Sequence, residues 1–316
     1  MTQIKPNLFI VGAGKAGTFA MYHYLNQHPQ VFMSPVKEPN YFGSDLLYRQ
    51  RRIALDEYLA MFDGAKGKKA IGEASVRYLM SKTAPAEMAE FADDPRIVIM
   101  LRDPIDVLYS RHSQNVKCAV EDILDFKEAM DAEHERRLGK RIPNGTEVIN
   151  DLFYSDWIRF GEQCERYISQ FGRKRVSLIF YDDFSQDPIQ CFHQLCKDLG
   201  IGSDFVPPPD RINENKKIRN HFINRAARGK IKPVTMLSRI VMPNAKLRQA
   251  VKNKINSLNS SSAKRPPLDS DFESELRGRL SLEIDHLSQI VERDLSHWKI
   301  ARARSGHGAN PAEPVA

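Results

Sequence analysis

The stretch Leu8-Phe9-Ile10-Val11-Gly12-Ala13-Gly14-Lys15-Ala16-Gly17-Thr18 decides the fold. Its first four residues are an apolar run that ends in glycines, which is typical of a buried parallel strand. Residues 18–27 continue with apolar side chains at helical spacing until His28-Pro29 ends the pattern. A glycine loop between a strand and a helix gathers backbone N–H groups at the positive end of the helix dipole. The segment therefore predicts an anion site of a size that suits a phosphate.

The rest of the chain alternates between strand and helix patterns. Further strands are expected at residues 70–72, 97–101 and 176–180, and helices at about 84–92, 104–116, 124–138, 154–171 and 187–199. This alternation predicts an α/β fold in which a central, mainly parallel sheet is flanked by helices on both faces. In such a sheet, ligands bind beyond the carboxyl ends of the strands.

Positive charge is concentrated in one segment of the chain. The 316 residues carry a net charge of +7, yet residues 211–265 hold fifteen Lys or Arg and a single acid, Glu214. Such a basic segment suits an anionic ligand, an anionic acceptor or a peripheral membrane contact, or it forms a solvated helical face. Nucleic acid is not expected as a partner, because Phe222 is the only aromatic residue between these cations and no nucleic-acid-binding motif is present.

The domain organisation follows from these patterns. We expect one domain over residues 1–300, with residues 211–265 as a basic lid or linker insertion, a docking helix within 269–298 and a disordered tail over 301–316. No apolar run reaches the ~18 residues of a membrane span and no signal-peptide pattern is present, which predicts a cytoplasmic protein. The four cysteines form no CxxC pair and have no histidine partners at metal-ligand spacing, so we expect reduced thiols and no metal site.

The glycine loop fits two common nucleotide motifs poorly. Gly12-x-Gly14-x-x-Gly17 matches the letters of the dinucleotide fingerprint, and Glu38 follows about twenty residues later. Glu38, however, lies in Lys37-Glu38-Pro39 rather than at the end of a strand. A Walker A loop requires lysine directly before the hydroxyl residue, whereas Lys15 precedes Thr18 by three positions. A nucleoside triphosphatase is therefore not expected.

Two segments together resemble a known family. Residues 9–18 with the later Lys37-Glu38-Pro39-Asn40-Tyr41-Phe42 resemble the 5′-phosphosulfate segment of the sulfotransferases that use 3′-phosphoadenosine-5′-phosphosulfate (PAPS), in their heparan-sulfate-type and bacterial branch. The run from Ile97 through Arg102-Asp103-Pro104 to Ser110 resembles the 3′-phosphate segment of that family. The resemblance continues through Gly72-Glu73-Ala74-Ser75 and residues 180–188 and 266–298, and so covers nearly the whole chain to about residue 300.

The resemblance implies a nucleotide site with P-loop-like geometry. Lys15 would stabilise charge at the sulfate and the leaving oxygen, and the backbone N–H groups of Ala16, Gly17, Thr18 and Phe19 would hold the 5′-phosphate, with a contact from the Thr18 hydroxyl. Arg102 and Ser110 would clamp the 3′-phosphate, unless Arg102 instead pairs with Asp103 or Asp106. Lys216, Lys217 and Arg219 are expected in a basic loop over the nucleotide, since Ala74 stands where some relatives carry a lysine.

The resemblance also implies the chemistry. Glu38 matches the catalytic glutamate of the heparan-sulfate-type enzymes and is expected to be the general base, unless it is a solvated acid paired with Lys37. His112 is the alternative base, although we expect it at the surface of its helix. Asn40 stands where some relatives have a histidine. The implied activity is in-line transfer of a sulfuryl group to a hydroxyl, less readily an amine, of a carbohydrate or lipid-linked acceptor. A nucleotide-binding module without turnover and a dinucleotide-dependent oxidoreductase are the alternatives.

Overall fold

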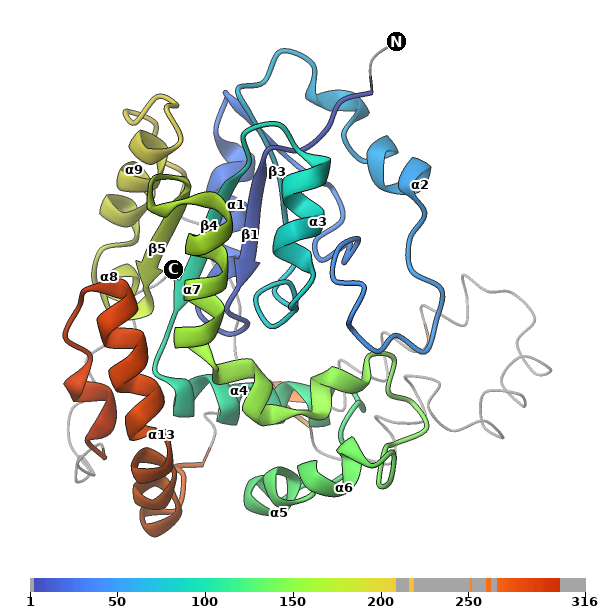
Figure 1. Ribbon diagram of the computed structural model, residues 1–316, viewed down its shortest axis with the longest axis vertical. Helices are drawn as coiled ribbons and strands as arrows, with labels where there is room; N and C mark the ends of the chain where they lie inside the picture. The colour runs from blue at the N-terminus through green and yellow to red at the C-terminus, as the bar shows by residue number, and fades with distance from the viewer. Residues whose placement is uncertain (1–2, 209–215, 219–250, 252–259, 263–265, 302–316) are drawn as a thin grey trace.

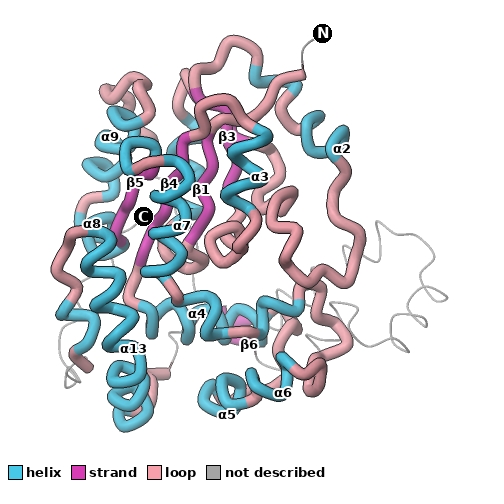
Figure 2. The backbone as a smooth tube through the Cα atoms, in the orientation of Figure 1, coloured by secondary structure: helices cyan, strands magenta, loops and turns pink. Residues whose placement is uncertain are grey.

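The computed structural model describes residues 3–208, 216–218, 251, 260–262 and 266–301. Its centre is a sheet of strands β1 (Leu8–Gly12), β2 (Val31–Met33), β3 (Ala70–Ala74), β4 (Arg96–Leu101) and β5 (Val176–Phe180). The strands lie in the order β2-β3-β1-β4-β5, and every neighbouring pair is parallel. Figure 2 shows the sheet with helices on both sides. The predicted fold class is confirmed.

Strand β1 lies at the centre of the sheet, and all five of its residues are buried. Leu8 pairs with Gly72 of β3 on one side and with Arg96 of β4 on the other. From β1 the chain passes through α1 to β2 and β3 on one side of β1, and then crosses to β4 and β5 on the other side. A parallel sheet opens a crevice for ligands at such a switch point, beyond the carboxyl ends of the strands.

Helices cover both faces of the sheet (Figure 1). On one face, α1 (Thr18–Gln27) meets α9 (Pro188–Asp198), where the ring centroids of Tyr24 and Phe192 lie 5.9 Å apart. On the opposite face lie α3 (Ala84–Phe91) and α7 (Phe160–Phe171). Helix α7 buries Phe160, Cys164, Tyr167 and Phe171 at spacings of three or four residues, so one apolar stripe packs against the core.

Helix α4 (Pro104–Lys117) begins directly after β4 and crosses below the carboxyl edge of the sheet (Figure 1). Its N-cap is Asp103, whose carboxylate accepts a hydrogen bond of 2.9 Å from the backbone N–H of Ile105, while Pro104 occupies the first helical position. The short helices α5 (Phe126–Asp131) and α6 (Glu133–Arg137) follow it.

Helix α13 (Ser270–Val291) lies against α7 and is tied to the body by buried polar contacts. Arg277 on α13 lies 3.1 Å from the carboxylate of Asp103, and the indole N–H of Trp298 donates to Asp182 of α8 (Tyr181–Gln186) at 2.9 Å. Outside the main sheet, β6 (Lys216–Ile218) and β7 (Ser260–Ser262) form an antiparallel pair. No helix among the described residues is long and apolar enough to cross a membrane.

Several short elements escape sequence prediction. Strand β2, helix α2 (Leu55–Ala60) and helix α8 are three to six residues long and show too few periods of either pattern. The helix expected at 124–138 divides into α5 and α6, and the one expected at 154–171 divides into a 3₁₀ turn and α7. The 3₁₀ turns are Asp63–Ala65, Ile149–Leu152, Tyr154–Ile158, Arg173–Arg175 and Ser296–Lys299. Most of the expected lid over 211–265, and the tail after Ala301, lie outside the described residues.

Candidate functional site

The glycine loop turns from the carboxyl end of β1 into the first turn of α1. Gly17 is the N-cap of α1 with a φ of 91°, and a Cβ atom there would lie 3.2 Å from side-chain atoms of Met100 and Phe184. Only glycine takes this conformation without strain. Within the described part of the chain no side chain caps α1, and its first turn carries no acid. Helix N-termini that bind phosphate share this lack of a side-chain cap.

The predicted phosphate-contact residues are placed around this turn. Lys15 is half-buried with a φ of 72°, in the left-handed region. Ala16 is fully buried, Thr18 is 4% exposed and Phe19 is 37% exposed. The N–H of Ala16 donates to the carbonyl oxygen of Ala13 at 3.3 Å, and Thr18 is almost fully buried. The phosphate contacts of these residues stay predictions.

Arg102 follows β4 and joins the second predicted segment to the first. Its Nη1 donates to the carbonyl oxygen of Lys15 at 3.4 Å, so the segments after β1 and β4 meet at the switch point. Its Nε and Nη2 lie 3.2 and 3.1 Å from Oδ2 of Asp106, and its guanidinium stacks 4.1 Å from the ring centroid of Tyr181. The expected alternative partner, Asp106, is therefore present beside Arg102.

Two residues of α4 that were considered for the site, Ser110 and His112, are buried. Ser110, two turns after Arg102, is 6% exposed. His112 is 4% exposed, so the expectation of a surface histidine is wrong. Its Nε2 lies 2.9 Å from the carbonyl oxygen of Ile123, and its ring packs against Phe126 and Tyr154. Burial lowers the pKa of His112. The rings of Phe126 and Tyr154 cover this position of α4, which explains why the histidine is buried.

Glu38 lies on the loop after β2, in a left-handed conformation with a φ of 61°. Its N–H donates to the carbonyl oxygen of Ala74 at 2.9 Å, which fixes it beside the end of β3. Its carboxylate lies between two cations, with Oε1 3.2 Å from Lys37 Nζ and Oε2 3.5 Å from Arg77 Nη1. The side chain is 32% exposed. Lys37 also lies 5.8 Å from the ring centroid of Phe19, which brings the Glu38 loop beside α1.

A buried carboxylate supports the Glu38 loop from below. Glu73 on β3 is fully buried, and its oxygens accept hydrogen bonds from the hydroxyls of Tyr58 (2.8 Å), Tyr78 (2.8 Å) and Ser75 (2.6 Å). Ser75 Oγ accepts the N–H of Asn40 at 3.1 Å, and Tyr78 Oη accepts the N–H of the next residue at 2.8 Å. Burial raises the pKa of Glu73 to about 7, against the opposing effect of the three hydroxyl donors.

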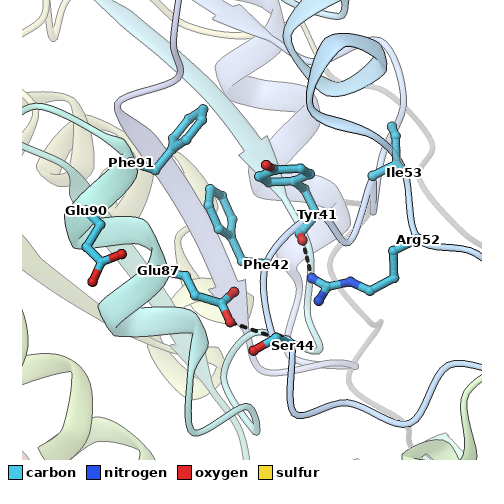
Figure 3. Close-up of a pocket in the computed structure, with 8 residues that line it drawn as sticks. All are labelled: Tyr41, Phe42, Ser44, Arg52, Ile53, Glu87, Glu90 and Phe91. Carbon is cyan, nitrogen blue, oxygen red and sulfur yellow. Dashed lines mark hydrogen bonds between the residues drawn. The ribbon is translucent and has the colours of Figure 1, made fainter.

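The segment after Glu38 is also anchored from the outside, next to a pocket of about 470 Å³ between residues 41–53 and α3 (Figure 3). Arg52 donates to the carbonyl oxygen of Tyr41, and the carboxylate of Glu87 accepts the N–H groups of Gly43 and Ser44 at 2.7 and 2.9 Å. The pocket lining includes none of the residues predicted for the site. The pocket lies beside the segment after Glu38, because Tyr41, Phe42 and Ser44 belong to its lining.

Sequence reasoning missed a chain of charges that ends at Glu38. Arg77 and Arg111 share the buried carboxylate of Asp151, and Arg77 reaches on to Glu38. The Arg111 and Arg77 guanidinium groups outweigh the effect of burial and lower the pKa of Asp151. Arg77 stands only four residues after Glu73, but no local pattern connects it with Asp151, which is 74 residues away. Contacts of this kind become visible only in the folded chain.

The remaining predicted residues are only partly described. Lys216 and Lys217 belong to β6, whose backbone pairs with β7, and Arg219 lies outside the described residues. In the described ranges, no group of three or more His, Cys, Asp or Glu is arranged to hold a metal ion.

The sulfotransferase domain family model matches residues 5–260 of the chain. A solved sulfotransferase from Alicyclobacillus acidocaldarius superposes with a TM-score of 0.70 and 26% sequence identity, over 94% of this chain and 100% of that one.

Curated relatives match more locally. The human bifunctional heparan sulfate N-deacetylase/N-sulfotransferase 3 is 24% identical over 62% of this chain and 22% of its own length. Human carbohydrate sulfotransferase 15 is 29% identical over 33% of this chain and 26% of its own length. The membrane-associated sulfotransferase kil1 of Dictyostelium discoideum is 25% identical over 35% and 23%, respectively. The matched region thus spans about a quarter of the length of these relatives.

Proposed function

The chain belongs to the sulfotransferase domain family, and from this premise we propose that it transfers the sulfuryl group of PAPS to a hydroxyl group of a carbohydrate or glycolipid acceptor. The family match supports sulfuryl transfer, and the choice of PAPS as donor rests on the geometry around β1 and β4. The observation that carries the proposal is the contact between Arg102 and the carbonyl oxygen of Lys15, at 3.4 Å. It joins a phosphate-type loop to a guanidinium at the switch point of the sheet.

The two halves of this site suit the two ends of the donor. The first turn of α1, with its uncapped N–H groups, would hold the 5′-phosphate, and Lys15 would face the sulfate and the bridging oxygen. Arg102 is held by Asp106 and Tyr181 one strand away, where a 3′-phosphate would meet it. Ser110, Lys217 and Arg219 remain proposed contacts of the nucleotide.

The proposed reaction is an in-line displacement. Glu38 takes the proton of the acceptor hydroxyl as that oxygen attacks sulfur, and a new O–S bond forms. The bond between sulfur and the bridging oxygen breaks, and its electron pair leaves with 3′,5′-adenosine bisphosphate. Lys15 stabilises the charge that develops on this leaving oxygen. Glu38 is preferred over His112 as the base, because Glu38 is a third exposed while His112 is buried against a backbone carbonyl.

A carbohydrate acceptor is proposed from the names of the relatives, two of which act on heparan sulfate or carbohydrate. The basic segment 211–265 would favour an anionic glycan or a charged lipid surface. The acceptor is tested by incubating the protein with ³⁵S-labelled PAPS and a panel of heparosan, chondroitin and extracted glycolipids.

The donor site is tested first by calorimetric titration. We expect 3′,5′-adenosine bisphosphate to bind far more tightly than AMP, ATP or NAD. Charge-assisted hydrogen bonds contribute about 1.5–3 kcal/mol each, so Arg102→Ala should weaken bisphosphate binding roughly 10- to 100-fold and leave AMP binding nearly unchanged. Binding of NAD or ATP in place of the bisphosphate would overturn the proposal in favour of a dinucleotide or triphosphate enzyme. Tight bisphosphate binding without label transfer to any acceptor would favour a module without turnover.

A further inference from the structure

Four charged side chains form a continuous chain from the interior to Glu38. Arg77 holds Asp151 with two parallel bonds of 2.8 Å, from Nε to Oδ1 and from Nη2 to Oδ2. Arg111 Nη2 adds a third contact to the same carboxylate at 2.6 Å, and Asn115 donates to the Asp151 carbonyl oxygen at 2.8 Å. The side chain of Asp151 is 4% exposed, so its position is fixed by these partners.

The parallel bonds to Asp151 determine where the rest of the Arg77 guanidinium points. A guanidinium is planar, so engagement of Nε and Nη2 leaves Nη1 on the opposite edge of the fork. That atom lies 3.5 Å from Oε2 of Glu38. Arg77 is 16% exposed and has little freedom to turn elsewhere.

The inner end of the chain contacts the phosphate loop through Trp157. The Arg111 guanidinium stacks 3.6 Å from the ring centroid of Trp157. A Cβ atom on Gly14 would lie 3.2 Å from the same ring. The glycine loop and Glu38 therefore contact the same cluster of side chains, which links the proposed donor loop to the proposed base.

The charges of the cluster also require a partner such as Glu38. The guanidinium groups of Arg111, 5% exposed, and Arg77, 16% exposed, share the single charge of Asp151, and an excess charge that is largely shielded from water is costly unless it is compensated. Glu38 supplies the second carboxylate from the solvent side. Lys37 binds its other oxygen, Oε1, at 3.2 Å. The carboxylate is thus held between two cations, while its side chain remains 32% exposed.

We propose that Arg77, clamped by Asp151, is a positioning residue that orients the Glu38 carboxylate toward the acceptor hydroxyl. This inference rests on the proposed role of Glu38 as general base. It assigns a function in turnover to Arg77 and Asp151, which no sequence motif marks. Because a misplacement of about 1 Å can cost about 100-fold in rate, orientation by Arg77 should be visible in kcat.

The test compares the full-length wild type with Arg77→Gln, Arg77→Lys and Arg166→Gln. Arg166 is a matched control, since its side chain is 20% exposed and pairs with Glu162 at 2.6 Å, away from Glu38. Crystal structures of each protein report the rotamer and order of Glu38 directly. Calorimetry reports binding of 3′,5′-adenosine bisphosphate. Turnover is followed as bisphosphate release from PAPS, with heparosan oligosaccharide and with water alone as acceptor, between pH 5 and pH 9.

We expect Arg77→Gln to displace Glu38 and lower kcat roughly 10- to 100-fold, with KM for PAPS and bisphosphate affinity within about twofold of wild type. Arg77→Lys keeps the charge but not the fork, so it should restore part of the rate and serves if Arg77→Gln does not fold. An unchanged Glu38 rotamer with unchanged kcat in both variants would overturn the inference. Failure of the wild type to bind the bisphosphate would instead overturn the proposed function, and the crystallographic result would still decide whether Arg77 positions Glu38.

Discussion

Arg102, two residues before α4, pairs with Asp106 in the first turn of that helix, with Nη2 of the arginine 3.1 Å and Nε 3.2 Å from the same carboxylate oxygen. Both side chains are about one quarter exposed, so the pair is accessible at the proposed nucleotide site. The carboxylate holds the guanidinium in place, but it also presents a negative charge where we propose that a phosphate binds. The two effects oppose each other.

We expect repulsion to outweigh orientation, because Tyr181 also fixes the guanidinium by stacking on it at 4.1 Å. Asp106→Asn keeps the shape and removes the charge. It should tighten binding of 3′,5′-adenosine bisphosphate by about three- to tenfold at low salt, an effect that salt should screen. AMP, which lacks the 3′-phosphate, is the control ligand and should show little change. Weaker bisphosphate binding in calorimetry would show that Asp106 mainly orients Arg102.

Glu38→Gln tests the proposed base. The amide retains the size of the side chain but cannot accept a proton, so turnover of PAPS with an acceptor should fall by about 10²- to 10⁴-fold. Binding of the bisphosphate should stay within about twofold of wild type. The matched control is Glu57→Gln, whose wild-type carboxylate is half-exposed and pairs with Arg51. Wild-type turnover in Glu38→Gln would remove Glu38 from the mechanism.

These residues show which parts of the site can be predicted from the sequence. The strand and glycine loop around Gly12–Gly17, the turn after β4 with Arg102, and the exposed loop of Glu38 all have local patterns, and the structure brings them to one edge of the sheet. The contacts of Arg77 with Asp151 and of Arg277 with Asp103 join residues 74 and 174 positions apart, and no periodicity encodes them. The expectation of a surface position for His112 is wrong for the same reason. Its burial depends on Phe126 and Tyr154, which come from other elements.

Glu73 should make stability depend on pH. Burial raises its pKa from 4.5 in the unfolded chain to about 7. Between these values the folded state holds a proton that the unfolded state has lost, so the free energy of unfolding falls as pH rises. The expected slope is about −1.4 kcal/mol per pH unit from this group.

Urea denaturation of wild type and Glu73→Gln between pH 4.5 and pH 8 isolates this effect, because all other titrations are shared. The stability of the wild type should decline relative to the variant up to about pH 7 and run parallel above it. Parallel curves over the whole range would mean that the three hydroxyl donors keep Glu73 ionised.

Gly17→Ala should damage both folding and the donor site. Alanine at a φ of 91° is strained, and its Cβ would press on Met100 and Phe184 at 3.2 Å. We expect a loss of about 1–3 kcal/mol in the free energy of unfolding and at least a tenfold loss of bisphosphate affinity, because the N–H groups after Gly17 would shift. The control is Gly278→Ala in α13, where nothing lies within 4 Å of the added Cβ. The free energy of unfolding of that variant should rise by up to about 1 kcal/mol, and the variant should bind the bisphosphate normally.

Arg277 connects α13 to the turn that carries Arg102. It is 4% exposed, lies 3.1 Å from Asp103 and 2.7 Å from Glu273, and donates to the carbonyl oxygen of Trp298. Arg277→Ala would leave two carboxylates and a carbonyl in the interior without this partner. Breaking a buried pair in this way costs about 3–5 kcal/mol, which urea denaturation should register.

The same substitution should also weaken binding of the proposed nucleotide. Asp103 is the N-cap of α4 and the neighbour of Arg102, so loss of its partner on α13 should loosen the turn after β4. We expect bisphosphate affinity to fall severalfold in Arg277→Ala. The control is Arg279→Ala, also in α13, whose wild-type side chain is 57% exposed and pairs with Glu275 at 3.8 Å. This variant should change the free energy of unfolding by less than about 0.5 kcal/mol and bind the bisphosphate normally. A stable Arg277→Ala with normal binding would mean that apolar packing of α13 against α7 is enough to hold the turn, and that the buried arginine adds nothing to the site.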